Sequence, residues 1–148
     1  LQIYMQAGDS PQDLPVYRMI NETRAAAQSR AEQLMKLLQA EASRQHSLGT
    51  TPHATSESLT FELAKGTHFE IRNSEGRTGS GALPEQDLPS VAVVLKFATK
   101  SAARVHKALR LGKPAVVAAV RDEKVWIDLK AVQNDDLEIL AEKIFQAL

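Results

Sequence analysis

The 148-residue sequence contains no cysteine, which excludes disulfide bonds, a thiolate nucleophile and any metal site built on cysteine. Its 18 basic and 18 acidic residues leave a formal net charge of +0, so the chain as a whole does not attract nucleic acid or an anionic membrane. No apolar run approaches the roughly 20 residues that cross a bilayer, and residues 1–10 lack the pattern of a signal peptide. These absences predict a cytoplasmic protein with no membrane partner.

The common catalytic and metal-binding motifs are also missing. There is no phosphate-binding P-loop, and Gly79-Ser80-Gly81 is too short for the nucleophile elbow of a hydrolase. No histidine lies three or four residues from another, as a helical pair of metal ligands would. We therefore predict no catalytic residue and no metal ligand in this chain. The histidines are His46, His53, His68 and His106.

The sequence does have enough apolar side chains, 43% of its residues, to form one packed domain. A long helix is predicted from a cap at Asn21 or Thr23 to about His46, because apolar residues recur there at spacings of three and four. The apolar stripe comprises Ala27, Ala31, Leu34, Leu38 and Ala42. The polar side, which we expect to face water, comprises Arg24, Arg30, Glu32, Lys36, Glu41 and Arg44.

The rest of the chain alternates between strand and helix patterns. We predict a loop over residues 47–58, whereas residues 59–65 fit either a short helix or a strand. Strands are expected over residues 68–72, 90–97, 115–120 and 125–129, and helices over residues 99–111 and from Asn134 or Asp135 onward. Thr99 is the expected cap of the first of these helices, and Gly112 followed by Pro114 is the expected stop. This order predicts an α+β fold, a mostly antiparallel sheet with helices packed on one face.

Two acidic segments have structural explanations, and one of them, Asp135 and Asp136, lies at the start of the last predicted helix, near the positive end of its dipole. Asp122 and Glu123 are expected to form the tight turn of a hairpin. Asp128 lies in a predicted strand with opposite parity to the apolar Val125 and Ile127. We expect it to pair with a lysine or arginine on a neighbouring strand rather than to act in catalysis.

The strongest local signal is the glycine-rich stretch between two predicted strands, within residues 76–89. Three glycines occur in six positions, and glycine lets a backbone approach a ligand or another chain closely. Exposed N–H groups in this stretch would suit an anion, and the Arg77 guanidinium would add positive charge. The alternative is a plain flexible connector, although Leu-Pro steps at residues 83–84 and 88–89 stiffen the path.

Four blocks, in order, resemble the C-terminal part of the bacterial L-seryl-tRNA(Sec) selenium transferase (selenocysteine synthase) family. Each block is short, but together they cover nearly the whole chain. They are residues 14–20 (LPVYRMI), 79–84 with 88–90 (GSGALP and LPS), 112–117 (GKPAVV) and 125–130 (VWIDLK). An insertion relative to the family falls around residues 47–66.

The resemblance implies a fold-type-I pyridoxal phosphate (PLP) enzyme, whose large domain holds the Schiff-base lysine and whose small C-terminal domain closes over the active site. Residues 1–20 would be the end of the large domain and a connector, and residues 21–148 the small domain. In the family the substrate is seryl-tRNA, and selenium comes from selenophosphate. The chain begins at Leu1 and lacks the lysine motif, so we expect a piece of a longer protein that binds no PLP alone and is inactive alone.

The resemblance also implies partners and site residues. The partners would be the large PLP-binding domain of the same protein, further copies in a homo-oligomer, and tRNA. The residues that it places near substrate or cofactor are Arg18, Arg77, Thr78, Gly79, Ser80 and Gly81.

The sequence departs from the family pattern at a few positions. Ala118 aligns with an arginine of the family, and in related PLP enzymes such an arginine grips a substrate carboxylate. Gly76-Arg77 replaces Ser-Gln, and Ala82 replaces a serine. These changes leave two alternatives: the small domain of a related PLP-dependent lyase acting on a small or phosphorylated amino substrate, and a non-enzymatic interaction domain. Arg77 would suit an anionic substrate.

Overall fold

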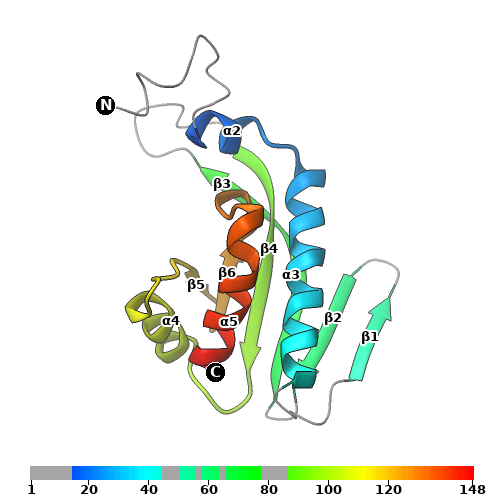
Figure 1. Cartoon of the computed structure of the whole chain (residues 1–148), viewed down its shortest axis with the longest axis vertical. Helices are drawn as coiled ribbons and strands as arrows, with labels where there is room; N and C mark the ends of the chain where they lie inside the picture. Colours follow the sequence, from blue (N-terminus) through cyan, green and yellow to red (C-terminus); the bar gives the residue numbers. More distant parts are fainter. Residues whose placement is uncertain (1–14, 45–50, 56–57, 64–65, 78–86) are drawn as a thin grey trace.

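Six strands form the sheet of this chain, for which a computed structural model describes residues 15–44, 51–55, 58–63, 66–77 and 87–148 (Figure 1). The strand order is β1-β2-β3-β4-β6-β5, and every neighbouring pair is antiparallel. The strands are β1 (Thr51–Thr55), β2 (Ser58–Leu63), β3 (Thr67–Arg77), β4 (Asp87–Phe97), β5 (Ala119–Arg121) and β6 (Lys124–Asp128). The predicted α+β class with an antiparallel sheet is confirmed.

Helices pack against one face of this sheet. The elements are α2 (Pro15–Asn21), α3 (Arg24–Arg44), α4 (Ala102–Leu111), α5 (Leu137–Ala147) and two short 3-10 turns, η2 (Leu129–Ala131) and η3 (Asn134–Asp136). In Figure 1, α3 and α5 run side by side across the sheet, and α4 lies beside α5. Their apolar side chains join those of the strands in one core cluster. Within the described ranges, none of these helices has the length and apolar character needed to cross a membrane.

Helix α3 forms where its apolar period predicts it. The Thr23 side chain caps its start, because Oγ1 accepts a hydrogen bond from Ala26 N at 3.3 Å. All five residues of the predicted apolar stripe are buried: Ala27, Ala31, Leu34, Leu38 and Ala42. The prediction that the polar side faces water is wrong for one residue, because Arg30 is only 8% exposed. That exception leads to the candidate site described below.

The predicted loop over residues 47–58 is wrong where the structure describes it. Residues 51–55 form β1, which pairs with β2 from Thr51↔Glu62 to Thr55↔Ser58. β1 is the outer strand of the sheet, a position where few apolar side chains and a proline such as Pro52 are tolerated. Residue 58 of the predicted loop and residues 59–63 of the ambiguous segment form β2. Residues 47–50, 56–57 and 64–65 lie outside the described part.

Strand β2 is attached to the core by an aromatic pair. Phe61 and Phe69 of β3 stack with ring centroids 4.4 Å apart and planes at 6°, and both are almost fully buried. Phe61↔Phe69 are also register partners in the β2–β3 ladder. The pair therefore fixes the outer hairpin to the central strands.

The predicted glycine-rich loop over residues 76–89 is shorter than expected. Gly76 and Arg77 belong to β3, and β4 begins at Asp87, because the ladder continues through Gly76↔Leu88 and Arg77↔Asp87. The extended backbone that the second Leu-Pro step favours is thus used in a strand. Residues 78–86 lie outside the described part.

Two details around α4 also differ from expectation. Its cap is Ser101 rather than Thr99, since the Ser101 side chain accepts a hydrogen bond from Arg104 N at 3.3 Å. The predicted stop is confirmed, because the helix ends at Leu111, immediately before Gly112.

The predicted buried strand over residues 115–120 is mostly wrong. Only residues 119–121 pair with β6, and Val117 is 85% exposed. The reason is local, because Val116 N donates a hydrogen bond to Leu109 O of α4 at 2.9 Å and not to a neighbouring strand. β5 is therefore a short strand at the other edge of the sheet.

The predicted β5–β6 hairpin is confirmed. Its two-residue turn places Asp122 at φ 50° and Glu123 at φ 55°, the combination of a type I′ turn. Residues with a Cβ atom are strained there, whereas glycine is not.

Glu123→Gly is therefore expected to raise the free energy of unfolding by about 1 kcal/mol, since it removes that strain. Chemical denaturation followed by circular dichroism measures the change. Glu142→Gly, in the middle of α5, is the control and should destabilise the protein by about 1 kcal/mol or more. A decrease in stability for both variants would show that the turn is unstrained.

Candidate functional site

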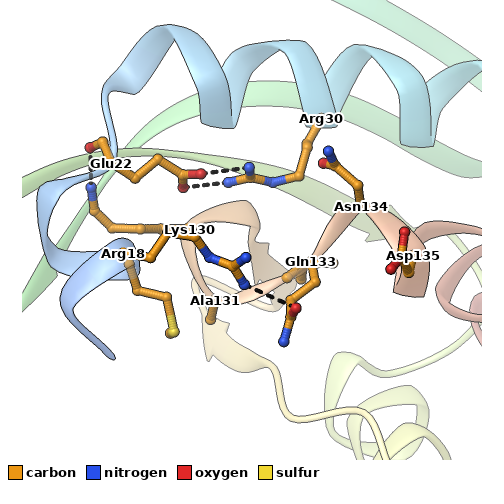
Figure 2. Close-up of a pocket in the computed structure, with 10 residues that line it drawn as sticks. Arg18, Glu22, Arg30, Lys130, Ala131, Gln133, Asn134 and Asp135 are labelled. Atoms are coloured by element: carbon orange, nitrogen blue, oxygen red, sulfur yellow. Dashed lines mark hydrogen bonds and ion pairs between the residues drawn. The ribbon is translucent and has the colours of Figure 1, made fainter. Parts of the chain in front are cut away.

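A polar pocket lies where the α2–α3 junction meets the segment that follows β6 (Figure 2). Its volume is about 300 Å³. It is lined by Arg18, Met19, Glu22, Arg30, Lys130, Ala131, Val132, Gln133, Asn134 and Asp135. These residues come from two parts of the chain that are far apart in sequence, so the pocket depends on how the two parts are held together.

A largely buried ion pair forms one wall of the pocket. The Arg30 guanidinium faces the Glu22 carboxylate in a two-pronged arrangement, in which Nη1 donates to Oε1 at 2.5 Å and Nη2 donates to Oε2. The side chains are only 10% and 14% exposed. Such a geometry satisfies both charged groups and holds them in one orientation.

The same residues are bonded to the backbone across the pocket. Arg30 donates to Leu129 O from Nε at 3.2 Å and from Nη2 at 2.9 Å. In return, Lys130 Nζ donates to Glu22 O at 2.7 Å. We call Glu22, Arg30 and Lys130 the junction latch, because these bonds tie the turn between α2 and α3 to the end of β6 (Figure 2).

Asp128 holds the other end of the latch in place. Its Oδ1 accepts hydrogen bonds from Ser90 Oγ at 2.5 Å and from Lys130 N at 3.0 Å, and its Oδ2 accepts one from Ser74 Oγ at 2.7 Å. The expectation that Asp128 pairs with a basic side chain is therefore wrong, since its described partners are hydroxyl and backbone groups. It caps η2 and so sets the direction of the backbone that carries Leu129 and Lys130.

A comparison with known protein families identifies the family to which this chain belongs. The family model described as SelA, L-seryl-tRNA selenium transferase, matches residues 51–133, more than half of the chain. The chain belongs to the L-seryl-tRNA selenium transferase family. The resemblance drawn from the four sequence blocks is thereby confirmed.

Curated relatives in this family match most of the chain at modest identity. The L-seryl-tRNA(Sec) selenium transferase of Aquifex aeolicus is 23% identical over 137 residues, which is 93% of this chain and 25% of the relative. The protein of the same name from Alkaliphilus metalliredigens is 24% identical over 144 residues, 97% of this chain and 26% of the relative. That from Pasteurella multocida is 28% identical over 148 residues, 99% of this chain and 27% of the relative. The chain thus spans about a quarter of the length of these selenium transferases.

Of the residues predicted to lie near substrate or cofactor, Arg18 lies at the pocket. It is exposed on α2, and its Nη2 donates to Gln133 Oε1 at 2.9 Å. Arg77 is the last residue of β3, and its side chain is not described. Thr78, Gly79, Ser80 and Gly81 lie outside the described part, so their place near a selenium transferase substrate stays a prediction.

Sequence reasoning missed the latch although a signal was present. Arg30 lies three residues after Ala27 and four before Leu34, which places it within the apolar stripe of α3. A charged residue at such a position is buried only with a partner. Glu22, just before the helix, is that partner, whereas the contribution of residues 129–130 depends on the tertiary fold.

The described lining of the junction pocket does not fit a PLP Schiff base. The buried amine of the pocket, Lys130 Nζ, is bonded to Glu22 O, and the Glu22 carboxylate is bonded to Arg30. A Schiff-base lysine needs an accessible amine, and these groups are committed to holding the junction. Nor do the described ranges contain three histidine, aspartate, glutamate or cysteine residues grouped as metal ligands would be.

Proposed function

We propose that the chain is the small C-terminal domain of a PLP-dependent enzyme that converts seryl-tRNA(Sec) to selenocysteinyl-tRNA(Sec). The observation that carries the proposal is the family match over residues 51–133, which contain all six strands of the sheet, α4 and η2. The Schiff-base lysine and the PLP would belong to the large domain of the same protein. The chain alone would therefore be inactive.

The overall reaction exchanges one group on the seryl side chain. The Ser Cβ–O bond breaks and the hydroxyl leaves as water, a C–Se bond forms with the selenium of selenophosphate, and water cleaves the Se–P bond, which releases phosphate. PLP in the large domain would stabilise negative charge that develops on the substrate next to this carbon. The cytoplasmic enzyme would act as a homo-oligomer.

In the reaction, this domain would position the substrate and close over the active site of the large domain. The junction latch supports this role, because it ties the α2–α3 turn, where a connector from the large domain would enter, to the end of β6. A movement of the connector would then move the sheet with it as one unit. Arg18, and Arg77 with the glycines that follow it, would approach the substrate from this domain.

A second candidate is a PLP-dependent lyase acting on a small or phosphorylated amino substrate. Ala118 favours it, because the family carries an arginine at the aligned position, whereas Ala118 packs with its methyl group against the core. A small-domain arginine that grips a carboxylate would then be absent from this position.

The substrate separates the two candidates. Full-length protein loaded with PLP is incubated with seryl-tRNA(Sec) and radioactive selenophosphate, and the label in the tRNA fraction is counted. The proposal predicts label in the tRNA, at a rate that depends on the seryl group. No label in the tRNA, together with cleavage of a small amino substrate, would favour the lyase.

A further inference from the structure

A second hollow, beside the junction pocket, lies between the segment that links α4 to β5 and the start of α5. Its volume is about 370 Å³, and most of the side chains that line it are apolar. The most buried of them are Ile127 and Leu140, which are 1% and 5% exposed. Val117 and Ile139 also line it but are 85% and 45% exposed. We call this hollow the apolar groove.

The exposure of Val117 is unusual for a large apolar side chain. It is built into the backbone, because the hydrogen bond from Val116 N to Leu109 O turns this segment away from the sheet. Exposed apolar side chains that border an apolar hollow gain free energy when a partner excludes water from them. Such a patch is typical of an interaction surface.

The groove does not suit a small polar ligand. Sites for such ligands place a few convergent polar groups within apolar walls. The charged groups that line the groove are the carboxylates of Asp128 and Asp136. Asp128 already accepts hydrogen bonds from Ser74, Ser90 and Lys130, and Asp136 is exposed. The groove is therefore suited to apolar side chains on the surface of another domain.

The groove is continuous with the place where a connector would enter. Ala131 and Val132 line both the apolar groove and the junction pocket, and Arg18 of α2 lines the junction pocket as well. On α2, Val16 and Tyr17 are 48% and 46% exposed. Exposed apolar side chains thus occur both at the groove and on the helix that lies next to it, at the end of the molecule where α2 is drawn in Figure 1.

We infer that the large domain of the same protein chain covers the apolar groove with apolar side chains. The inference rests on the proposed function, in which the large domain precedes α2. This chain spans about a quarter of the length of its curated relatives, so a large part of such a protein remains to pack against it. A connector that enters at α2 holds the large domain beside the groove, and a short tether gives an effective concentration of roughly millimolar. A tethered domain therefore covers the groove in preference to a free second copy.

Cysteine accessibility in the full-length protein measures whether the groove is covered. Val117→Cys places a thiol at the groove. Leu111→Cys is the matched control, because Leu111 is 63% exposed on α4 and does not line the groove. Each variant is treated with N-ethylmaleimide, and the label is quantified by mass spectrometry. Both positions fall in one tryptic peptide, residues 111–121, because trypsin does not cut at Lys113-Pro114.

Position 117 should be labelled at least about tenfold more slowly than position 111 in the folded full-length protein. The domain by itself exposes Val117 more than Leu111, so slow labelling requires a cover from elsewhere. The ratio of rates is normalised to the ratio in urea, where both thiols are free. Labelling at position 117 that is as fast as at position 111, or faster, overturns the inference.

Photo-crosslinking identifies what covers the groove. Val117→p-benzoylphenylalanine is introduced into the full-length protein, which is irradiated, separated by mass and digested. We expect a crosslink from position 117 to a peptide outside this sequence, in a product with the mass of one chain. A product with the mass of two chains assigns the groove to a second copy and overturns the inference, as do crosslinks confined to this sequence.

Selenium transfer by the unsubstituted full-length protein is measured in parallel, so that the two proposals fail separately. Slow labelling at position 117 without transfer to seryl-tRNA(Sec) contradicts the proposed reaction but supports the covered groove. Transfer together with fast labelling supports the reaction and overturns the inference.

Discussion

Arg30→Gln is expected to lower the free energy of unfolding by about 3 kcal/mol or more. The substitution leaves the Glu22 carboxylate, which is only 14% exposed, without its charged partner, and it removes the bonds that Leu129 O receives from the guanidinium. Breaking a buried pair on one side is costly because the remaining charge stays desolvated. Urea denaturation followed by circular dichroism measures the loss.

The control for this effect is Arg44→Gln on the same helix. Arg44 is paired with Glu41 but is 75% exposed, so the same substitution should change stability by less than about 1 kcal/mol. The double variant Glu22→Gln/Arg30→Gln should be less unstable than the two single losses added together, since both charges are removed at once. Equal effects of the Arg30 and Arg44 variants would contradict the latch.

Phe69→Ala should have an effect of similar size, a loss of about 3–5 kcal/mol. Phe69 is fully buried and stacks on Phe61, so its removal leaves a cavity and also loosens the attachment of β2. The midpoint of thermal unfolding and the urea midpoint should both fall.

Phe97→Ala is the matched control, because Phe97 at the end of β4 is only partly buried against the same core. Its loss should be clearly smaller than that of the Phe69 variant. If the Phe97 variant is the less stable of the two, the aromatic pair does not fix the outer hairpin.

Much of the fold was predictable where one local pattern decides the outcome. The three- and four-residue spacing in α3 correctly identified its buried face, because a helix of this length can bury only one stripe against a sheet. The hairpin of β5 and β6 was predictable from Asp122-Glu123 between apolar segments. In β6 and the first residue of η2, the alternation of Val125, Ile127 and Leu129 matched their burial.

The prediction of the fold from the sequence failed where tertiary contacts override the local sequence pattern. β1 has few apolar side chains and is a strand because β2 lies beside it, held by Phe61. Residues 115–118 have a strand-like composition, yet the hydrogen bond of Val116 N to α4 diverts the backbone from the sheet. No periodicity within either segment contains this information.

The candidate site was predictable only in part. Arg18 was selected from the sequence and does line the pocket, whereas Arg30 was assigned to water and Lys130 was not considered. The latch joins residues 22 and 30 to residues 129–130. These segments are far apart in the sequence, and no local pattern predicts that they are in contact.

Selenium transfer by the full-length protein, compared with the same protein cut after residue 23 of this sequence, tests the central claim most directly. Absorbance of bound PLP is measured in both, as evidence that the large domain is folded. Our account predicts that the shortened protein still binds PLP but no longer transfers selenium from selenophosphate to seryl-tRNA(Sec). Transfer at the full rate by the shortened, PLP-bound protein would contradict a closing role for this domain.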